Sequence, residues 1–301
     1  MGLLIALIPA VGWGIQPLIL KKIGGRPTNE ILGTGIGAVL VGLLVQLFAS
    51  PAGISVTTFL ISLLSGAFWV IGQTGQYTSF NLIGVSKTMP ISTALQLVGT
   101  SLIGVFAFGE WSGSMGKIIG AAAIILLVFG SALTAISDDP GKKGGITKGI
   151  SLLASTSIGY WVYSALPKLV DASGLSIFFP QMIGVFLGAV IYVIFRKPTA
   201  FSEDKSWKAT IVGAIFSVSA LAYIFSANEN GVATAYIITQ LNVVISTLGG
   251  MYILHENKTP KEKKLTIIGC LNQTVSTYKK IALEFPTSLE FLALFNCLRY
   301  K

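Results

Sequence analysis

The sequence predicts an all-α polytopic membrane protein, built as an inverted five-plus-five helix repeat with nine clear transmembrane helices and a tenth that is missing or degenerate. Three observations predict it: the composition, the number of long apolar segments, and a similarity between the two halves. Of the 301 residues, 52% are hydrophobic and only 11% are charged. Ordinary globular chains carry roughly a quarter charged residues. The charges are therefore too few to give a chain of this length a soluble surface.

A helix that spans a bilayer needs about 20 mostly apolar residues. The turn signal Ser50-Pro51-Ala52-Gly53 divides the longest apolar stretch into two such helices. A soluble protein would have to cover all these helices with polar elements, whereas lipid covers them in a membrane. The spans are predicted at 2–20, 31–49, 55–80, 88–108, 117–136, 148–166, 174–195, 209–227 and 231–254.

Lysine and arginine are distributed unevenly between the loops. Those after the first, third, fifth, seventh and ninth spans are basic, as with Lys21, Lys22 and Arg26, while the other loops hold only Lys117 and Lys168. The positive-inside rule places the basic loops in the cytoplasm and the N-terminus outside. The net charge of +9 is then explained by basic loops beside the anionic inner leaflet of the plasma membrane, and not by binding to nucleic acid. We expect a multi-pass protein whose surrounding partner is the lipid bilayer.

The two halves of the chain are similar to each other. Asn81-Leu82-Ile83-Gly84-Val85 is similar to Asn228-Glu229-Asn230-Gly231-Val232, and Ile91-Ser92-Thr93 to Ile238-Thr239-Gln240, both at a separation of 147 residues (81 to 228). We expect a first repeat at 1–137 and a second at 147–269. An odd number of spans turns the second copy upside down, an arrangement typical of secondary transporters. The alternative is coincidence between apolar segments of similar composition.

The repeat breaks down near the C-terminus. Ile118-Ile119-Gly120 opens an apolar helix, but Ile267-Ile268-Gly269 is followed by the polar run from Cys270. We expect 270–301 to be an aberrant polar or amphipathic tail. One hypothesis is that it is read out of the ancestral frame. The other is a genuine amphipathic segment on the membrane surface.

Polar side chains inside a membrane are costly and mark functional sites by default. A polar solute would need such groups, with aromatic rings as flat apolar faces. Trp69, Gln73 and Gln76 share one helix face. The alternatives are amides that bond helices together and aromatic anchors at the membrane interface. The substrate-binding candidates are Trp13, Gln16, Trp69, Gln73, Gln76, Gln96, Tyr160, Trp161, Gln181, Gln240 and Asn242.

Carboxylates are scarce and fall in loops, in the tail or at span ends. A proton-coupled carrier usually needs a titratable group in its pathway. The candidates are Glu110 and Glu256, at equivalent ends of the fourth and ninth spans, and Glu229 between the eighth and ninth. The alternative for each is a solvated helix terminus.

Glycines recur at helical spacing, as in Gly33 with Gly37 and Gly184 with Gly188. This small-xxx-small pattern indicates close helix packing. With His255 as the single histidine, no Ser/His/Asp constellation or metal-ligand spacing is present, and no nucleotide-binding motif occurs. We expect no enzyme activity, no cofactor and no metal.

Four segments of the sequence are distinctive: 82–100 (LIGVSKTMPISTALQLVGT), Leu64 to Trp69 with Gly72-Gln73, Phe108-Gly109-Glu110-Trp111, and Gly231-Val232-Ala233-Thr234. They resemble the bacterial glucose/ribose porter family of the drug/metabolite transporter superfamily. The resemblance covers 1–269. It implies a ten-helix carrier that imports a monosaccharide such as glucose or ribose together with protons, by alternating access. The alternatives are a carrier of another small metabolite and a non-transporting remnant disabled by loss of the tenth helix.

Overall fold

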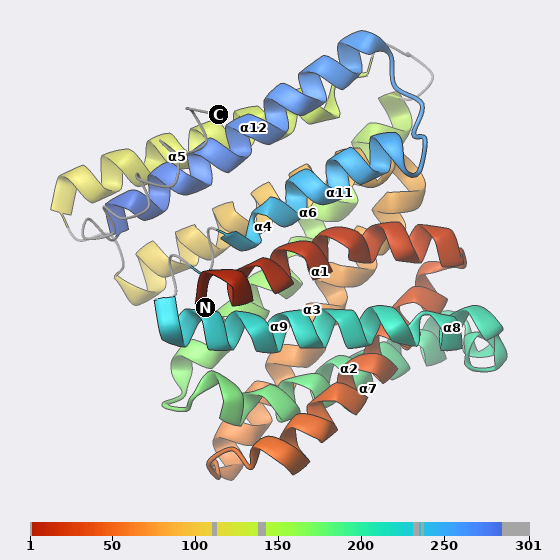
Figure 1. Cartoon of the computed structure of the whole chain (residues 1–301), viewed down its shortest axis with the longest axis vertical. Coiled ribbons are helices and arrows are strands. Elements are labelled where there is room, and N and C mark those ends of the chain that lie inside the picture. Colours follow the sequence, from red (N-terminus) through yellow and green to blue (C-terminus); the bar gives the residue numbers. More distant parts are fainter. Residues whose placement is uncertain (1, 110–112, 138–142, 231–234, 236–237, 285–301) are drawn as a thin grey trace.

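The computed structural model describes residues 2–109, 113–137, 143–230, 235 and 238–284, and its regular elements are all helical (Figure 1). Two short 3-10 turns, η2 (Leu166–Leu169) and η3 (Pro198–Ser202), flank α7. The helices are α1 (Gly2–Ile23), α2 (Pro27–Ala49), α3 (Val56–Ile83), α4 (Val85–Phe108), α5 (Gly113–Ala135), α6 (Lys143–Ala165), α7 (Gly174–Arg196), α8 (Asp204–Lys208), α9 (Thr210–Asn230), α11 (Leu241–Tyr252) and α12 (Pro260–Glu284).

Within the described residues, six helices are long and apolar enough to cross a membrane, at Leu4–Ile23, Pro27–Ala49, Val56–Ile83, Val85–Phe108, Gly174–Arg196 and Asp204–Glu229. They fall on six of the nine predicted spans. The other three predictions fall on α5, α6 and α11, so the count of nine is not established. α11 has only 12 residues, α6 carries two lysines, and the apolar part of α5 is short.

The outer surface of these helices is apolar. Phe48, Phe106 and Phe195 are each 83% exposed, and large aliphatic side chains lie exposed on the same helices. A soluble monomer rarely exposes so much apolar surface. Together with the six candidate spans, this identifies a multi-pass membrane protein whose large apolar side chains face lipid.

Helix α12 occupies the place beside α5 (Figure 1). It runs from Pro260 to Glu284 without a break at Cys270, where the sequence predicts the tail to begin. At Gly269 the two helices come close, since an added Cβ atom would lie 2.4 Å from the carbonyl oxygen of Gly130. α12 is not among the six candidate spans, and residues 285–301 lie outside the described part of the chain.

The main helix contacts form matching pairs. α1 packs on α9 and α11, and α6 packs in the same way on α3 and α4. α2 contacts α7 and α9, while α7 contacts α2 and α3. If α1 to α5 correspond to α6, α7, α9, α11 and α12, the contact of α2 with α7 maps onto itself and each of the others maps onto another in the set. The contacts of α4 with α11 and of α5 with α12 also map onto themselves, and that of α4 with α5 maps onto the smaller contact of α11 with α12.

Glycines allow the closest helix crossings. A Cβ atom at Gly66 would lie 1.9 Å from the carbonyl oxygen of Gln181, where α3 crosses α7. At Gly213 it would lie 2.1 Å from the carbonyl oxygen of Thr34, where α9 crosses α2. Gly66 and Gly213 are 147 residues apart, as are Gly37 and Gly184, which face the same two crossings from the partner helices. Only glycine allows backbones this close.

We expect Gly66→Leu to destabilise the protein, because the new side chain would collide with the backbone of α7, which cannot turn aside as a side chain can. Overpacking of this kind costs about 1–3 kcal/mol. Thermal unfolding of the detergent-solubilised protein should show a lowered midpoint. Gly53→Leu is the control, because a Cβ atom at Gly53 meets nothing within 4 Å. Equal midpoints for both variants would mean that the crossing is not tight.

Candidate functional site

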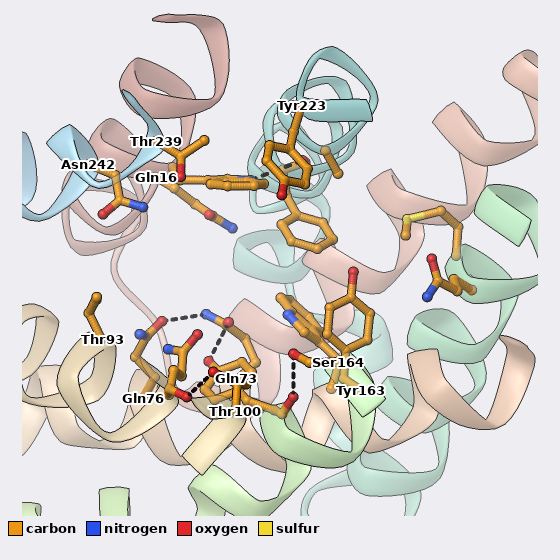
Figure 2. Close-up of a pocket in the computed structure, with 18 of the residues that line it drawn as sticks. Gln16, Gln73, Gln76, Thr93, Thr100, Tyr163, Ser164, Tyr223, Thr239 and Asn242 are labelled. Carbon is orange, nitrogen blue, oxygen red and sulfur yellow. Dashed lines mark hydrogen bonds between the residues drawn. The ribbon is translucent and has the colours of Figure 1, made fainter. Parts of the chain in front are cut away.

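A cavity of about 490 Å³ lies between the helices, with walls contributed by α1, α3, α4, α6, α7, α9 and α11. Binding sites for small molecules commonly measure about 300–1,000 Å³. Figure 2 shows two polar walls that face each other across it. One carries Gln16, Tyr223, Thr239 and Asn242, and the other carries Gln73, Gln76, Thr93, Thr100 and Ser164.

A chain of side-chain hydrogen bonds joins three helices along the second wall. The Tyr160 hydroxyl donates to Gln73 Oε1 (2.7 Å), and Gln73 Nε2 donates to Gln76 Oε1 (3.0 Å). Gln76 Nε2 and Gln96 Nε2 both donate to the Ser92 hydroxyl, at 2.9 and 3.2 Å. Because each amide is oriented by its neighbour, the wall presents fixed donors and acceptors instead of mobile side chains.

Aromatic rings cover another part of the cavity. The centroid of Trp69 lies 4.5 Å from that of Phe216 and 6.4 Å from that of Tyr160. Trp13 lies 6.2 Å from Tyr223, and its indole N–H donates to the Phe216 carbonyl oxygen at 3.3 Å. These contacts hold the rings as rigid apolar plates beside the amides.

The remaining amides are spread around the cavity. Gln16 Nε2 donates to the Tyr77 hydroxyl (3.4 Å), and Gln181 Nε2 donates to the Ser65 hydroxyl (3.2 Å). The side chain of Asn242 lies at the wall, and its Oδ1 is buried without a hydrogen-bond partner among the described residues (Figure 2). A buried unpaired acceptor is costly, so a ligand hydroxyl would fit there.

Ten of the eleven predicted binding residues line this cavity: Trp13, Gln16, Trp69, Gln73, Gln76, Gln96, Tyr160, Gln181, Gln240 and Asn242. Trp161 is not among its lining residues. Its indole N–H donates to the Leu95 carbonyl oxygen (3.0 Å), and its ring packs so closely on Gly99 that a Cβ atom there would lie 1.9 Å away. Trp161 therefore packs at the interface between α4 and α6.

Several lining residues were not predicted from the sequence, namely Tyr223, Ser164, Thr93, Thr100 and Thr239. A signal was present for two of them. Thr93 and Thr100 lie three residues before and four residues after Gln96, so one helix face carries all three. For Tyr223 and Ser164 we find no local signal, because nothing in the spacing of a single helix shows which face meets the cavity.

The three predicted coupling carboxylates lie away from this cavity or outside the described residues. Glu110 falls among residues that the structure does not describe, and Glu229 is exposed at the end of α9. Glu256 is half-buried and caps the N-terminus of α4. It accepts hydrogen bonds from the backbone N–H groups of Val85 and Ser86 (3.1 Å for Ser86) and from the Ser86 hydroxyl. A carboxylate is favoured there by the helix dipole and the unpaired N–H groups.

The loop after Glu256 brings a lysine into the same region. Lys258 donates to the Thr266 hydroxyl at 2.8 Å. Burial, with a smaller effect from the charge of Lys87, lowers the pKa of Lys258 to about 8 against the opposing effect of Glu256 and Glu262. The start of α4 and the start of α12 are thus joined by mutually dependent charges.

The sequence was compared with known families and curated proteins. The sequence profile of a family described as sugar transport protein matches residues 4–278. A protein of Lactiplantibacillus plantarum named for sugar uptake is 53% identical, over 84% of this chain and 89% of its own length. One from Lactobacillus helveticus, also named for sugar uptake, is 46% identical over 90% and 97%. A Staphylococcus epidermidis protein named for ribose uptake is 41% identical over 89% and 93%.

A comparison with solved structures finds the same arrangement of helices elsewhere. One crystal structure superposes with a TM-score of 0.62 and covers 92% of this chain and 98% of its own. Its sequence is only 15% identical. This similarity therefore shows a shared fold and nothing about activity.

We expect Glu256→Ala to destabilise the protein by about 0.5–2 kcal/mol, the usual cost of losing a helix N-cap. The thermal unfolding midpoint in detergent should fall. Glu229→Ala is the matched control, because it removes an exposed carboxylate from the end of another helix. If both variants unfold at the same temperature, the cap on α4 contributes nothing.

Proposed function

The chain belongs to the sugar transport protein family, and on that premise we propose that it imports a monosaccharide across the plasma membrane as a secondary carrier. The observation that carries the proposal is the cavity, in which oriented amides and hydroxyls from one set of helices face a second polar wall across rigid aromatic rings. An apolar metabolite would leave Asn242 Oδ1 and the spare hydrogen-bonding capacity of these walls unsatisfied.

A monosaccharide matches the chemistry of this cavity. Each sugar hydroxyl both donates and accepts hydrogen bonds, as do the amide groups of Gln16, Gln73 and Gln96. The C–H face of a sugar ring can pack on the flat face of Trp69. The unpaired oxygen of Asn242 would accept from one hydroxyl. Glucose and ribose both satisfy this description, so the proposal covers the two sugars.

Transport by alternating access needs two units that move about the central site. The paired helix contacts and the paired glycine crossings support an inverted five-plus-five repeat, in which α12 takes the tenth place. The two cavity walls would rock against each other, so that the cavity opens first to one side of the membrane and then to the other. The basic loop with Lys21, Lys22 and Arg26 would face the cytoplasm and the N-terminus the outside.

The proposal includes proton coupling, which a carrier needs if it accumulates sugar against a concentration gradient. A neutral sugar gains no energy from the membrane potential, so its accumulation requires a co-transported ion. We take that ion to be the proton, which enters the cell down its own gradient. The alternative function is transport of another polar metabolite. The experiment below distinguishes it from sugar import, because the labelled substrates are sugars.

The test is uptake of labelled glucose and, separately, of labelled ribose, each with the other sugar unlabelled as competitor, in cells that lack their own uptake systems for both sugars and express this chain. We expect saturable uptake that an uncoupler abolishes. Competition by ribose would show that one site takes both sugars. With the protein present in the membrane, absence of uptake of either labelled sugar would contradict the proposal.

We expect Gln73→Leu to raise the KM for sugar about tenfold, because it breaks the hydrogen bonds to Tyr160 and Gln76 and removes a cavity amide. A loss of about 1.4 kcal/mol in binding corresponds to that factor. Gln46→Leu is the matched control, since Gln46 is an amide in α2 that is not among the lining residues of the cavity. An unchanged KM for Gln73→Leu, measured by initial uptake rates, would remove this residue from the site.

A further inference from the structure

Glu30 lies in the first turn of α2, where the sequence predicts only a helix end. Its side chain is nevertheless buried, with 2% of the residue exposed. Its Oε2 atom is enclosed and has no hydrogen-bond partner among the residues that the structure describes. The carboxylates Glu203 and Glu256, by contrast, each bond to several donors.

Burial of a carboxyl group without a hydrogen-bond partner determines which of its protonation states has the lower free energy. An ionised carboxylate removed from water without an ion pair or hydrogen bonds costs much more free energy than a neutral carboxyl. Ionisable residues kept inside membrane segments therefore mark ion and proton pathways. Glu30 meets this description more closely than Glu229, which is exposed, or Glu256, which caps a helix.

Titratable groups of α1 and α3 lie within electrostatic range of the Glu30 carboxyl. Lys21 of α1 attracts it, although the lysine nitrogen itself bonds to Asn81 Oδ1 at 2.6 Å. The charge of a Glu30 carboxylate acts in turn on the Tyr77 hydroxyl of α3.

The other charged groups on elements that pack against α2 have different neighbours. Arg26 pairs with Glu203, and Asp204 with Lys208. On α7, Arg196 lies over the ring of Tyr192 and Lys197 follows at the helix end. Lys205 reaches toward Gly24, Tyr223 lies at the cavity, and Glu229 is exposed at the far end of α9.

A line of hydrogen bonds connects this position with the cavity. The Thr34 hydroxyl donates to the backbone carbonyl oxygen of Glu30 (2.8 Å), so its oxygen accepts from the Tyr77 hydroxyl (2.9 Å). The Tyr77 oxygen in turn accepts from Gln16 Nε2 (3.4 Å). Both Tyr77 and Gln16 line the cavity. The line therefore runs from the cavity, through two hydroxyl groups, to the backbone of the residue that carries the buried carboxyl.

We propose that Glu30 is the residue that carries the co-transported proton. A proton from water on the outside forms an O–H bond with the carboxylate before or with sugar binding, and the neutral carboxyl is then enclosed as in this structure. When the site opens to the cytoplasm, that O–H bond breaks and the proton leaves to water there. One proton and one sugar cross together, and Glu30 is again ionised. This inference rests on the proposed sugar import.

Purified protein in liposomes tests the inference with labelled glucose, or with labelled ribose if only ribose is taken up. Two modes are measured: accumulation driven by a pH gradient, and counterflow, which is the exchange of labelled for unlabelled sugar without a gradient. The variants are Glu30→Gln, which mimics the protonated carboxyl, and Asp171→Asn, which neutralises an exposed loop carboxylate as the control.

We expect Glu30→Gln to retain counterflow, with a rate that no longer depends on pH, and to bring sugar only to equal concentrations on the two sides. The wild type and Asp171→Asn should accumulate sugar and show pH-dependent counterflow. Gradient-driven accumulation by Glu30→Gln would overturn the assignment. So would pH-dependent counterflow in that variant. Absence of counterflow in the wild type would instead overturn the proposed function.

If Glu30→Gln lacks counterflow, Glu30→Asp decides the question. A shorter carboxyl in the same place can still take up and release a proton, but with an altered affinity. We therefore expect Glu30→Asp to accumulate sugar with a displaced pH profile. Accumulation with the wild-type pH profile would mean that Glu30 has only a structural role.

Discussion

The close crossings at Gly66 and Gly213 are the constraint on which the rest of this structure depends. Where two helices approach until backbone meets backbone, no side chain can lie between them, and the angle and register of both are fixed. α2 and α3 are each tied in this way to a helix of the second half. The remaining helices then pack at distances that leave a cavity between two polar walls. Van der Waals contact replaces the hydrophobic effect here, because lipid is as apolar as the helices themselves.

Much of the cavity could be predicted from the types of side chain alone. An amide inside an apolar helix must meet another polar group, so Gln73 and Gln76, on one face of α3, predict a polar wall. Trp161 shows the limit of this argument. Its position beside Tyr160 gives it the same composition signal, but its ring fills the α4–α6 interface. Neighbours in one helix point in different directions, and only the packing of other helices decides which one meets the cavity.

The positions of the helices could be predicted from the long apolar segments of the sequence, and each of the nine predicted spans coincides at least in part with a helix of the structure. The number that crosses a membrane is less clear from length and apolarity, because α6 and α11 are more polar or shorter than a typical span. The course of α12 past Cys270 was not predicted, since its polar composition indicates a tail and its contact with α5 depends on distant residues. Glu30 was overlooked for a similar reason. A carboxylate near a helix start usually meets solvent, and here it is almost fully buried.

Neither wall of the cavity belongs to a single half of the chain. One combines α1 with α9 and α11, and the other combines α6 with α3 and α4. If the two halves descend from one duplicated ancestor, that ancestor formed an antiparallel dimer. In this dimer the first helix of each copy packed on the other copy, as α1 and α6 do here. Fusion then turned a domain-swapped dimer into one chain without changing its interfaces. The first helix of each half packs on helices of the other half. Substitutions in α1 are therefore expected to co-vary with substitutions in α9, and not with those in the helices that follow α1 in the sequence.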